Sequence, residues 1–446
     1  MQRVREACGG RSKGPLHRVF KNAGLLFAGQ IAAGIFGLGA FALAARALGT
    51  ETFGVLILIH AYRLAIATIV RFNAWYAVIR YGTACLNEGR RRDLQGLLQF
   101  TGLLDLSGAV TGAVAAAAAA PVVGPWVGWP SDVIALGQLY SLSIVVNAVD
   151  TPTGILRLFD RFDIIAWLRL ASPMCRCLGA VAAYAVAADL RAFLAIWFLA
   201  VVVDSALLWG FAVRELMRRG CLADMSLRLR GVTAPHAGIW RLVWSTNLNS
   251  TLGVVFGRLT TLVLGSVLGP AGAGLYHVAA QFAAVFDRPV EMLRRTIYPE
   301  LAQLSAGKKL AAMRHLAIRS ILLVAAVVVP LVIVVTLFAQ PLLRFSVGDS
   351  YIAASIVLSW LMVRQAILAL GFPLGLMLVS LDRATSLLKV NLATGVFYMA
   401  VLIGALSLWG LGGAGFAASA AALVAVLLNL AAVVKVFRRG ASAGTA

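Results

Sequence analysis

Charged residues are scarce in this chain. Only 13% of its 446 residues are Asp, Glu, Lys or Arg, whereas a soluble globular domain carries roughly 25%. Hydrophobic residues make up 61% of the chain, in blocks of about twenty, which is the length that a helix needs to cross the hydrocarbon of a bilayer. The short segments of alternating polarity that build a membrane β-barrel do not occur. We therefore expect an all-α, polytopic membrane protein.

Acidic residues are especially few. The 18 Asp and Glu residues face 39 Lys and Arg residues, which gives a formal net charge of +21. An excess of this size is also typical of nucleic-acid binding, but here most basic residues lie in the short connections between apolar blocks. That distribution indicates cytoplasmic loops beside anionic lipid. We expect membrane lipids, and no nucleic acid, as partners.

Cysteines are also few, and long loops on the outer side are missing. The five cysteines are Cys8, Cys85, Cys175, Cys177 and Cys221, and no pair of them resembles an extracellular disulfide or has a metal-ligand spacing. The connections on the outer side have at most about a dozen residues, too short for a catalytic domain. We expect no enzyme activity, no catalytic residues, no cofactor and no metal site.

The apolar blocks predict about twelve transmembrane helices. The expected spans are 22–48, 55–79, 96–120, 133–157, 164–188, 192–213, 242–268, 275–298, 317–339, 352–379, 387–409 and 413–434. The first block is too long for the apolar region of a signal peptide, so we read it as an uncleaved helix.

Basic residues predict the orientation of these spans. The segments on one side contain 27 of the 39 Lys and Arg residues, and the other side has only Arg46, Arg191 and Arg344. By the positive-inside rule both termini are cytoplasmic. The longest connection, 214–241, divides the chain into an N-terminal six-helix lobe, 1–213, and a C-terminal six-helix lobe with a short cytoplasmic tail, 242–446. We expect the two lobes to surround a central cavity.

The two halves share one spacing of glycines. Leu48-Gly49 is followed by Gly54 at the turn between the first two spans, and Leu268-Gly269 is followed by Gly274 at the corresponding turn of the second half. The spacing favours a transporter built from an internal repeat.

Arginine exceeds acid inside the expected spans, where nine arginines face five acidic residues when Arg46, Arg157 and Arg319, near span ends, are counted with the connecting segments. A charge in a membrane usually faces protein or water, so this surplus indicates a water-filled cavity that binds an anion. Arginine suits that role because its guanidinium binds phosphate through two hydrogen bonds and keeps its charge.

Helical spacing places polar residues on shared stripes of two spans. On 242–268 these are Asn247, Thr251, Arg258 and Thr261, and on 275–298 they are His277, Gln281, Arg288 and Arg295. We predict that the substrate path is lined by Arg63, Arg71, Asn247, Thr251, Arg258, Gln281 and Arg288.

Simpler roles stay open for several of the charges. Arg288 and Arg295 each have helical pair spacing to Glu291. Membrane-edge extension of the side chain is the alternative for Arg169, Arg294 and Arg295. For Asp105, Asp150 and Asp204 the alternatives are ion pairs with arginines, a proton relay or a coupling cation.

Several motifs resemble the polysaccharide transporter family of the O-antigen flippase (Wzx) type, within the multidrug/oligosaccharidyl-lipid/polysaccharide superfamily. The first begins at Asn22 through Gln30 and continues with Ala45-Arg46-Ala47-Leu48-Gly49 and Phe53-Gly54. The second is Gly154-Ile155-Leu156-Arg157 followed by Asp160-Arg161-Phe162. The third is Leu268-Gly269 with Gly274-Leu275-Tyr276, followed by Tyr298-Pro299-Glu300-Leu301-Ala302. The likeness extends over about residues 18–435. Family members often have an acidic residue in the middle of the seventh helix, where this chain has Arg258.

The resemblance implies a flippase of the bacterial inner membrane. Its substrate would be an undecaprenyl-pyrophosphate-linked oligosaccharide repeat, moved from the inner to the outer leaflet by alternating access for the synthesis of a surface polysaccharide such as O-antigen, capsule or exopolysaccharide. Other polysaccharide-assembly proteins would be its partners. A multidrug or organic-cation antiporter of the same superfamily is the first alternative, and it would need acidic residues in the cavity. A membrane polysaccharide polymerase or ligase is the second, and it would need a long outer loop.

Overall fold

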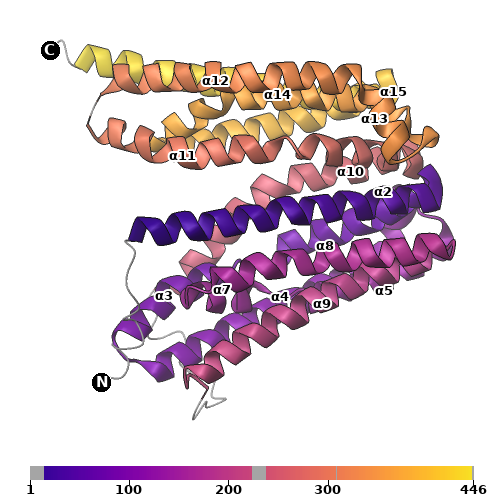
Figure 1. The fold of residues 1–446 in the computed structure, drawn as a ribbon, viewed down its shortest axis with the longest axis horizontal. Helices are drawn as coiled ribbons and strands as arrows, with labels where there is room; N and C mark the ends of the chain where they lie inside the picture. Colours follow the sequence, from indigo (N-terminus) through magenta and orange to yellow (C-terminus); the bar gives the residue numbers. More distant parts are fainter. Residues whose placement is uncertain (1–14, 223–237, 308, 444–446) are drawn as a thin grey trace. The chain divides into compact units, whose positions relative to one another are not determined.

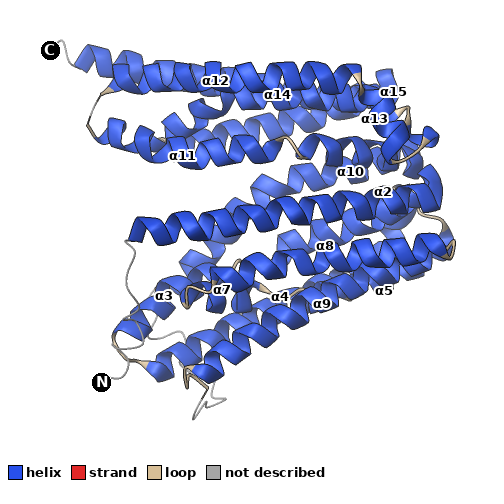
Figure 2. Cartoon of the chain, viewed as in Figure 1, coloured by secondary structure: helices blue, strands red, loops and turns tan. Residues whose placement is uncertain are grey.

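The structure is a computed structural model that describes residues 15–222, 238–307 and 309–443. Every regular element in these ranges is a helix, and no strand occurs in them (Figures 1 and 2). The prediction of an all-α protein is confirmed for the described chain.

The helices follow one another with short connections. In chain order they are α2 (Pro15–Val70), α3 (Trp75–Asn87), α4 (Arg91–Trp126), α5 (Ser131–Ser141), α6 (Ser143–Val146), α7 (Asp150–Leu158), α8 (Phe162–Ala185), α9 (Leu190–Arg218), α10 (Ile239–Ala284), α11 (Asp287–Ala306), α12 (Leu310–Leu337), α13 (Ala339–Ser346), the 3-10 turn η1 (Asp349–Tyr351), α14 (Ala354–Ser380) and α15 (Ala384–Ala443).

Nine helical segments of the described chain are long and apolar enough to cross a membrane. The sequence predicts about twelve crossings, and the difference arises because three helices each contain one expected span and all or part of the next. These are α2, α10 and α15, which are interrupted by non-helical residues at Gly49, Gly269 and Gly410. Counted as separate legs, the helices agree with the prediction of about twelve spans.

The exposed side chains of α12 suit a lipid environment. On α12, Leu322 and Val327 are each 63% exposed, and the most apolar window of this helix has a mean hydropathy of 3.0. Large exposed aliphatic side chains are costly in water but favourable against lipid tails. Their exposure supports a membrane-spanning role for the helix.

One expected span is broken near its middle. Within the apolar block 55–79, helix α2 ends at Val70 and helix α3 begins at Trp75. Between them, Asn73 lies in the left-handed region at φ 50°. Asn tolerates this backbone conformation better than most residues. The break makes Arg71 the first residue after a helix end.

A second expected span, 133–157, forms α5, α6 and α7 in place of one helix. Asn147 follows α6, and Asp150 begins α7. Short polar side chains of this kind compete with helical hydrogen bonds and favour helix ends. The predicted span is present as one apolar stretch, Ser131–Leu158, but apolar length does not detect the helix ends inside it.

A third break divides the expected span 275–298. The helix α10 ends at Ala284, and α11 begins at Asp287. Pro289 lies in the first turn of α11, where a missing backbone N–H costs little. The predicted stripe of polar residues on this span therefore lies on two helices.

Turns at equivalent places in the two halves have the same geometry. Gly49 has φ 71° and ψ 176°, and Gly269 has φ 73° and ψ −179°. Near the other end of each half, Asp160 and Asp382 both have φ 57°, and each is followed by an arginine whose N–H bonds back to the end of the preceding helix. These matched turns support the internal repeat that the glycine spacing indicates.

The chain packs into two compact units. The first comprises the described residues of Met1–Ala40, Ile69–Ala118 and Gln138–Asn249, and the second those of Phe41–Thr68, Ala119–Gly137 and Ser250–Ala446. The buried core of the first includes Val78, Leu156 and Leu216, and that of the second includes Met313 and Leu378. The predicted lobes divided at 214–241 follow the chain order and stay a prediction.

Within the second unit, the turns after the first legs of α2 and α10 pack on each other reciprocally. A Cβ atom built on Gly54 would overlap the carbonyl oxygen of Pro270. A Cβ atom on Gly274 would lie 2.9 Å from the carbonyl oxygen of Thr50. Both contacts join equivalent positions of the repeat, and neither leaves room for a side chain.

Candidate functional site

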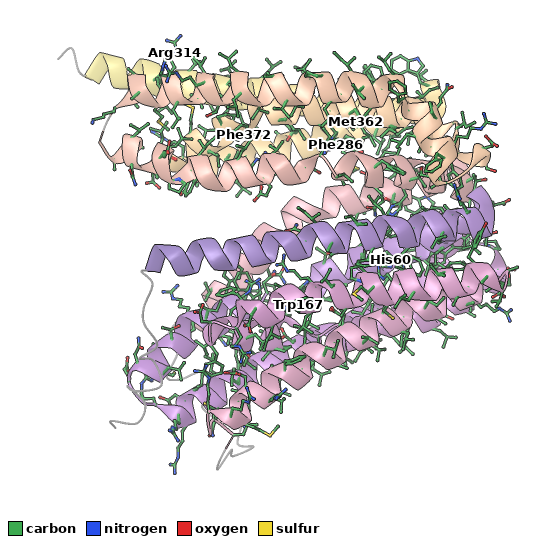
Figure 3. The ribbon with its side chains drawn as sticks, viewed as in Figure 1. His60, Trp167, Phe286, Arg314, Met362 and Phe372 are labelled. Atoms are coloured by element: carbon green, nitrogen blue, oxygen red, sulfur yellow. The ribbon has the colours of Figure 1, made fainter. Side chains whose placement is uncertain are left out.

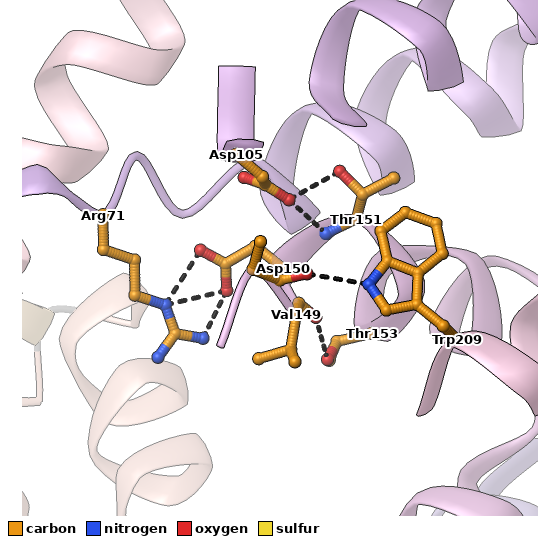
Figure 4. A network of polar contacts seen from close by, with 8 residues as sticks. Arg71, Asp105, Val149, Asp150, Thr151, Thr153 and Trp209 are labelled. Atoms are coloured by element: carbon orange, nitrogen blue, oxygen red, sulfur yellow. Dashed lines mark hydrogen bonds and ion pairs between the residues drawn. The ribbon is translucent and has the colours of Figure 1, made fainter. Parts of the chain in front are cut away.

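Two helix breaks in the first unit are joined by an ion pair (Figure 4). Arg71, in the break after α2, donates from Nε to both oxygens of Asp150 at 2.9 Å, and from Nη2 to Oδ1. Asp150 lies at the start of α7. Its side chain is 3% exposed, whereas that of Arg71 is 45% exposed. The pair therefore fixes a guanidinium beside an accessible space.

A second carboxylate lies next to this pair. Asp105 on α4 is buried, and its Oδ2 accepts hydrogen bonds from the N–H of Thr151 at 2.7 Å and from the hydroxyl of Thr151 at 2.6 Å. Its charge thus also faces the N-terminus of α7, where the helix dipole favours a negative group. Asp105 positions α7 and, with it, Asp150.

Side chains also satisfy the open backbone before α7. Trp209 on α9 donates its Nε1–H to the carbonyl oxygen of Ala148 at 2.9 Å, and the Thr153 hydroxyl donates to the carbonyl oxygen of Val149 (Figure 4). Irregular backbone at membrane depth requires such partners. Interrupted helices with polar side chains are the usual setting of transporter binding sites.

The guanidinium of Arg71 uses only part of its donors. Of the two buried carboxylates nearby, Asp105 and Asp150, it bonds to Asp150 alone, and Arg157 also lies within electrostatic range of Asp150. Within the described part of the chain, the Nη1 amine of Arg71 makes no hydrogen bond. The N–H groups of Nη1 are therefore available to a bound anion, as the sequence predicts for Arg71. The ion pair that was the alternative role for Asp150 is also present.

The other predicted residues are placed as follows. Arg63 and Asn247 are buried, at 3% and 7% exposure, and Arg258 and Gln281 are partly buried. The side chains of Thr251 and Arg288 lie outside the described residues. His60, one turn before Arg63, is likewise buried (Figure 3).

Around the second leg of α10 the predicted residues do come together. Gln281 Nε2 lies 3.1 Å from His277 Nε2, and the His277 ring packs against Phe41 with centroids 5.1 Å apart. Arg258 is close enough to His277 for the two to interact electrostatically. The roles of these residues in binding stay predictions.

A cavity of about 720 Å³ lies inside the second unit. It is lined by residues of α10, α11, α14 and α15. The lining residues that carry charge or hydrogen-bonding groups are Thr260, Tyr276, Asp287, Arg294, Arg364, Gln365, Asn391, Thr394 and Tyr398. Much of the remaining wall is alanine and glycine, whose small side chains leave the space open.

The sequence prediction missed this cavity. Of the seven predicted path residues, the five whose side chains the structure describes are not among its lining residues, although Arg258 directly follows one of them. The available signal was the stripe of Asn391, Thr394 and Tyr398, at steps of three and four within an apolar span. Arg294 was assigned to the membrane edge, and Arg364 was left without a role.

The sequence and fold are similar to known membrane proteins. Inner membrane protein YghQ of Escherichia coli (strain K12) is 29% identical over 302 residues, which cover 68% of this chain and 84% of YghQ. A multidrug resistance MATE family transporter of the MOP superfamily, in an inward-facing conformation, superposes with a TM-score of 0.72 at 14% identity over 94% of both chains. The lipid II flippase MurJ, in an inward closed conformation, gives a TM-score of 0.68 at 13% identity over 92% of this chain and 87% of MurJ.

At these identities the two solved structures establish the fold alone. That fold is shared by a transporter and a flippase. The family model described as polysaccharide biosynthesis protein matches residues 105–356. Because this match covers more than half of the chain, and agrees with the resemblance of the motifs, the chain belongs to the polysaccharide biosynthesis protein family.

Proposed function

We propose that this protein is an inner-membrane flippase that carries an anionic lipid-linked oligosaccharide from the inner to the outer leaflet. The observation that carries the proposal is the surplus of arginine inside the spans predicted from the sequence, nine against five acidic residues when Arg46, Arg157 and Arg319 near span ends are left out. In the structure, Arg71 is held half-exposed at a helix break by Asp150. Such a guanidinium suits a diphosphate group that enters from water.

The relatives support this choice. The family model is described as polysaccharide biosynthesis protein, and YghQ is named as an inner membrane protein. The fold neighbour MurJ is named as a lipid II flippase. A membrane-embedded protein of a polysaccharide pathway that has a transporter fold suits the step in which the lipid-linked repeat crosses the membrane. The cargo we propose is the undecaprenyl-pyrophosphate-linked repeat that the family resemblance implies.

The proposed mechanism is alternating access. The arginines on the predicted path, Arg63, Arg71, Arg258 and Arg288, attract the diphosphate head while the lipid tail stays in the bilayer. An inside-negative potential favours the outward movement of each unit of negative charge by about 2.3 kcal/mol per 100 mV. The membrane potential therefore provides a direction for transport of an anionic head.

Deletion of the protein is expected to cause accumulation of the lipid-linked repeat. Lipid extracts of the deletion strain are compared after return of the wild type or of the Arg258→Ala/Arg288→Ala double variant. We expect the wild type to clear the intermediate and the double variant to leave most of it, because the path loses two cations. The matched control is Arg314→Ala, which changes an exposed arginine on α12 (Figure 3) and should clear the intermediate normally.

Two results would contradict this proposal. One is a normal level of the lipid-linked repeat in the deletion strain. The other is a new sensitivity of that strain to organic cations, which would favour the antiporter.

We also propose that both termini are cytoplasmic. Single cysteines at Ser350 and Arg383, both exposed, are placed in a variant without the native cysteines. The positive-inside bias predicts that a membrane-impermeant maleimide labels Ser350→Cys in spheroplasts and labels Arg383→Cys only after lysis. The reverse pattern would show the opposite orientation.

A further inference from the structure

We propose that the cavity inside the second unit is a binding site for an oxyanion group, phosphate or carboxylate, on a sugar-bearing ligand, with Arg294 and Arg364 as its cationic residues. The inference rests on the proposed function, because it takes the transported molecule as the ligand. It adds a site that is separate from the predicted path residues.

The cavity adjoins a helix break. Ala283, Ala284 and Asp287 all line it, and they come from the end of α10 and the start of α11, on either side of Phe286 (Figure 3). The amide of Gln365 on α14 donates to the carbonyl oxygen of Ala283 at 3.2 Å. The open backbone is thereby satisfied without filling the space.

The charges of the lining are not balanced by one another. Asp287 accepts a hydrogen bond from Gln365 Nε2, and Arg364 Nη1 donates to Gln365 Oε1 at 3.1 Å. One neutral amide thus connects the acid and one arginine. A second guanidinium, that of Arg294, adds a positive charge for which the described lining provides no second carboxylate.

Arg294 is the strongest indication of a ligand. Its Nε is buried and has no hydrogen-bond partner among the described residues. A buried donor left unpaired costs about 1–3 kcal/mol, and more when it is charged. Such a group at a cavity wall is stabilised when an anion enters, because the anion supplies the missing acceptor.

The remaining lining suits a sugar next to that anion. Tyr276, Asn391, Thr394 and Tyr398 supply hydroxyl and amide groups, which both donate and accept hydrogen bonds. Thr260 donates to the Tyr398 hydroxyl oxygen at 3.0 Å and so orients it. The volume of about 720 Å³ lies within the range of roughly 300–1,000 Å³ that is usual for small-ligand sites.

A cation is a poor fit for the same space. Asp287 is the one carboxylate among the described lining residues and already bonds to Gln365, whereas two guanidiniums line the same cavity. An organic cation would meet like charge in a medium of low dielectric constant. The chemistry of the lining therefore favours an anion.

The test measures binding to the purified full-length protein in nanodiscs. The probes are inorganic pyrophosphate, glucuronate as a carboxylated sugar, and N-acetylglucosamine as a neutral one. We expect pyrophosphate or glucuronate to bind, and Arg294→Gln and Arg364→Gln each to weaken that binding about tenfold, because each removes one charge-assisted interaction. Arg314→Gln, an exposed arginine outside the cavity, should bind like the wild type.

The two anionic probes distinguish the source of the oxyanion. Preference for pyrophosphate assigns the cavity to the lipid-linked head group, and preference for glucuronate assigns it to an acidic sugar of the repeat. Equal binding to the wild type and to both cavity variants, with folding verified by unchanged melting temperatures, overturns the proposal. Arg294→Lys, which keeps the charge, should retain more binding than Arg294→Gln.

Lipid extracts separate this proposal from the proposed function. If the deletion strain accumulates the lipid-linked repeat while both cavity variants clear it and bind the probes normally, the flippase stands and the cavity site fails. If the cavity variants lose oxyanion binding while the deletion strain shows no accumulation, the site stands and the flippase fails.

Discussion

Replacing Arg71 with glutamine is expected to destabilise the protein by about 3 kcal/mol. The change leaves the Asp150 carboxylate, 3% exposed, beside the second buried carboxylate of Asp105 and without the cation that hydrogen-bonds to it. Removing one partner of a buried ion pair costs about 3–5 kcal/mol, and the lower end applies because the Arg71 side chain is 45% exposed. Thermal unfolding in detergent, followed by light scattering or intrinsic fluorescence, measures the loss.

The double variant Arg71→Gln/Asp150→Asn is expected to recover most of that stability. It removes the unpaired charge and keeps two amides of similar size, which can hydrogen-bond to each other. Arg314→Gln serves as the control for loss of an exposed arginine, with an expected change within about 0.5 kcal/mol. A double variant no more stable than Arg71→Gln would contradict the ion pair as the cause.

The same pair of variants separates stability from transport. If Arg71 contacts the anionic head, the double variant should fold well and still fail to clear the lipid-linked repeat. Full transport by the double variant would assign Arg71 a structural role only. Since Arg71 Nη1 has donors to spare in the described structure, we expect the failure.

Apolar block length predicted the fold class because lipid imposes it. A backbone in hydrocarbon must form helices or a closed barrel, so composition and block length suffice. The same signal does not find helix ends inside a block. It missed the breaks after Val70, before Asp150 and after Ala284, since these depend on single polar residues and on tertiary partners such as Asp105 and Trp209.

Helical spacing has a similar limit for the residues of a site. Helical spacing identifies residues on one face of one helix, as it did for His277 and Gln281, whose Nε2 atoms lie 3.1 Å apart. It does not identify partners on distant helices, such as Arg71 with Asp150 or Gln365 with Asp287. The cavity is lined by residues from four helices, α10, α11, α14 and α15, so the periodicity of the sequence could not predict which residues meet there.

The glycine spacing, by contrast, predicted a geometry that the structure shows in both halves. Gly49 and Gly269 share their backbone angles to within a few degrees. The spacing did not indicate that Gly54 and Gly274 pack against the opposite turn. That contact between equivalent positions leads to the last prediction.

Gly54→Ala is expected to lower transport to less than a tenth of the wild-type level and to destabilise the described conformation. The new Cβ would overlap the backbone carbonyl of Pro270, and backbone cannot rotate away as a flexible side chain does. The contact joins turns from the two halves of the repeat, so it has to form whenever the protein adopts this conformation. Transport is measured by clearance of the lipid-linked repeat, and stability by the melting temperature.

Gly274→Ala should have the same sign and a smaller effect. Its Cβ would lie 2.9 Å from the carbonyl oxygen of Thr50 and 3.1 Å from the Cα of Gly54, which is too close for a Cβ atom but a smaller overlap than that at Gly54. Gly37→Ala and Gly404→Ala are matched controls, because both glycines are helical and nothing lies within 4 Å of a Cβ built there.

The controls are expected to change stability in the opposite direction. Alanine in a helix interior is more favourable than glycine by about 0.5–1 kcal/mol, so Gly37→Ala and Gly404→Ala should raise the melting temperature slightly and transport normally. Gly54→Ala gains the same helical preference, but we expect it to lower the stability because the new Cβ overlaps the carbonyl oxygen of Pro270. If Gly54→Ala instead behaves like the two controls, the two turns do not need to meet during transport, and the reciprocal contact has no part in the transport cycle.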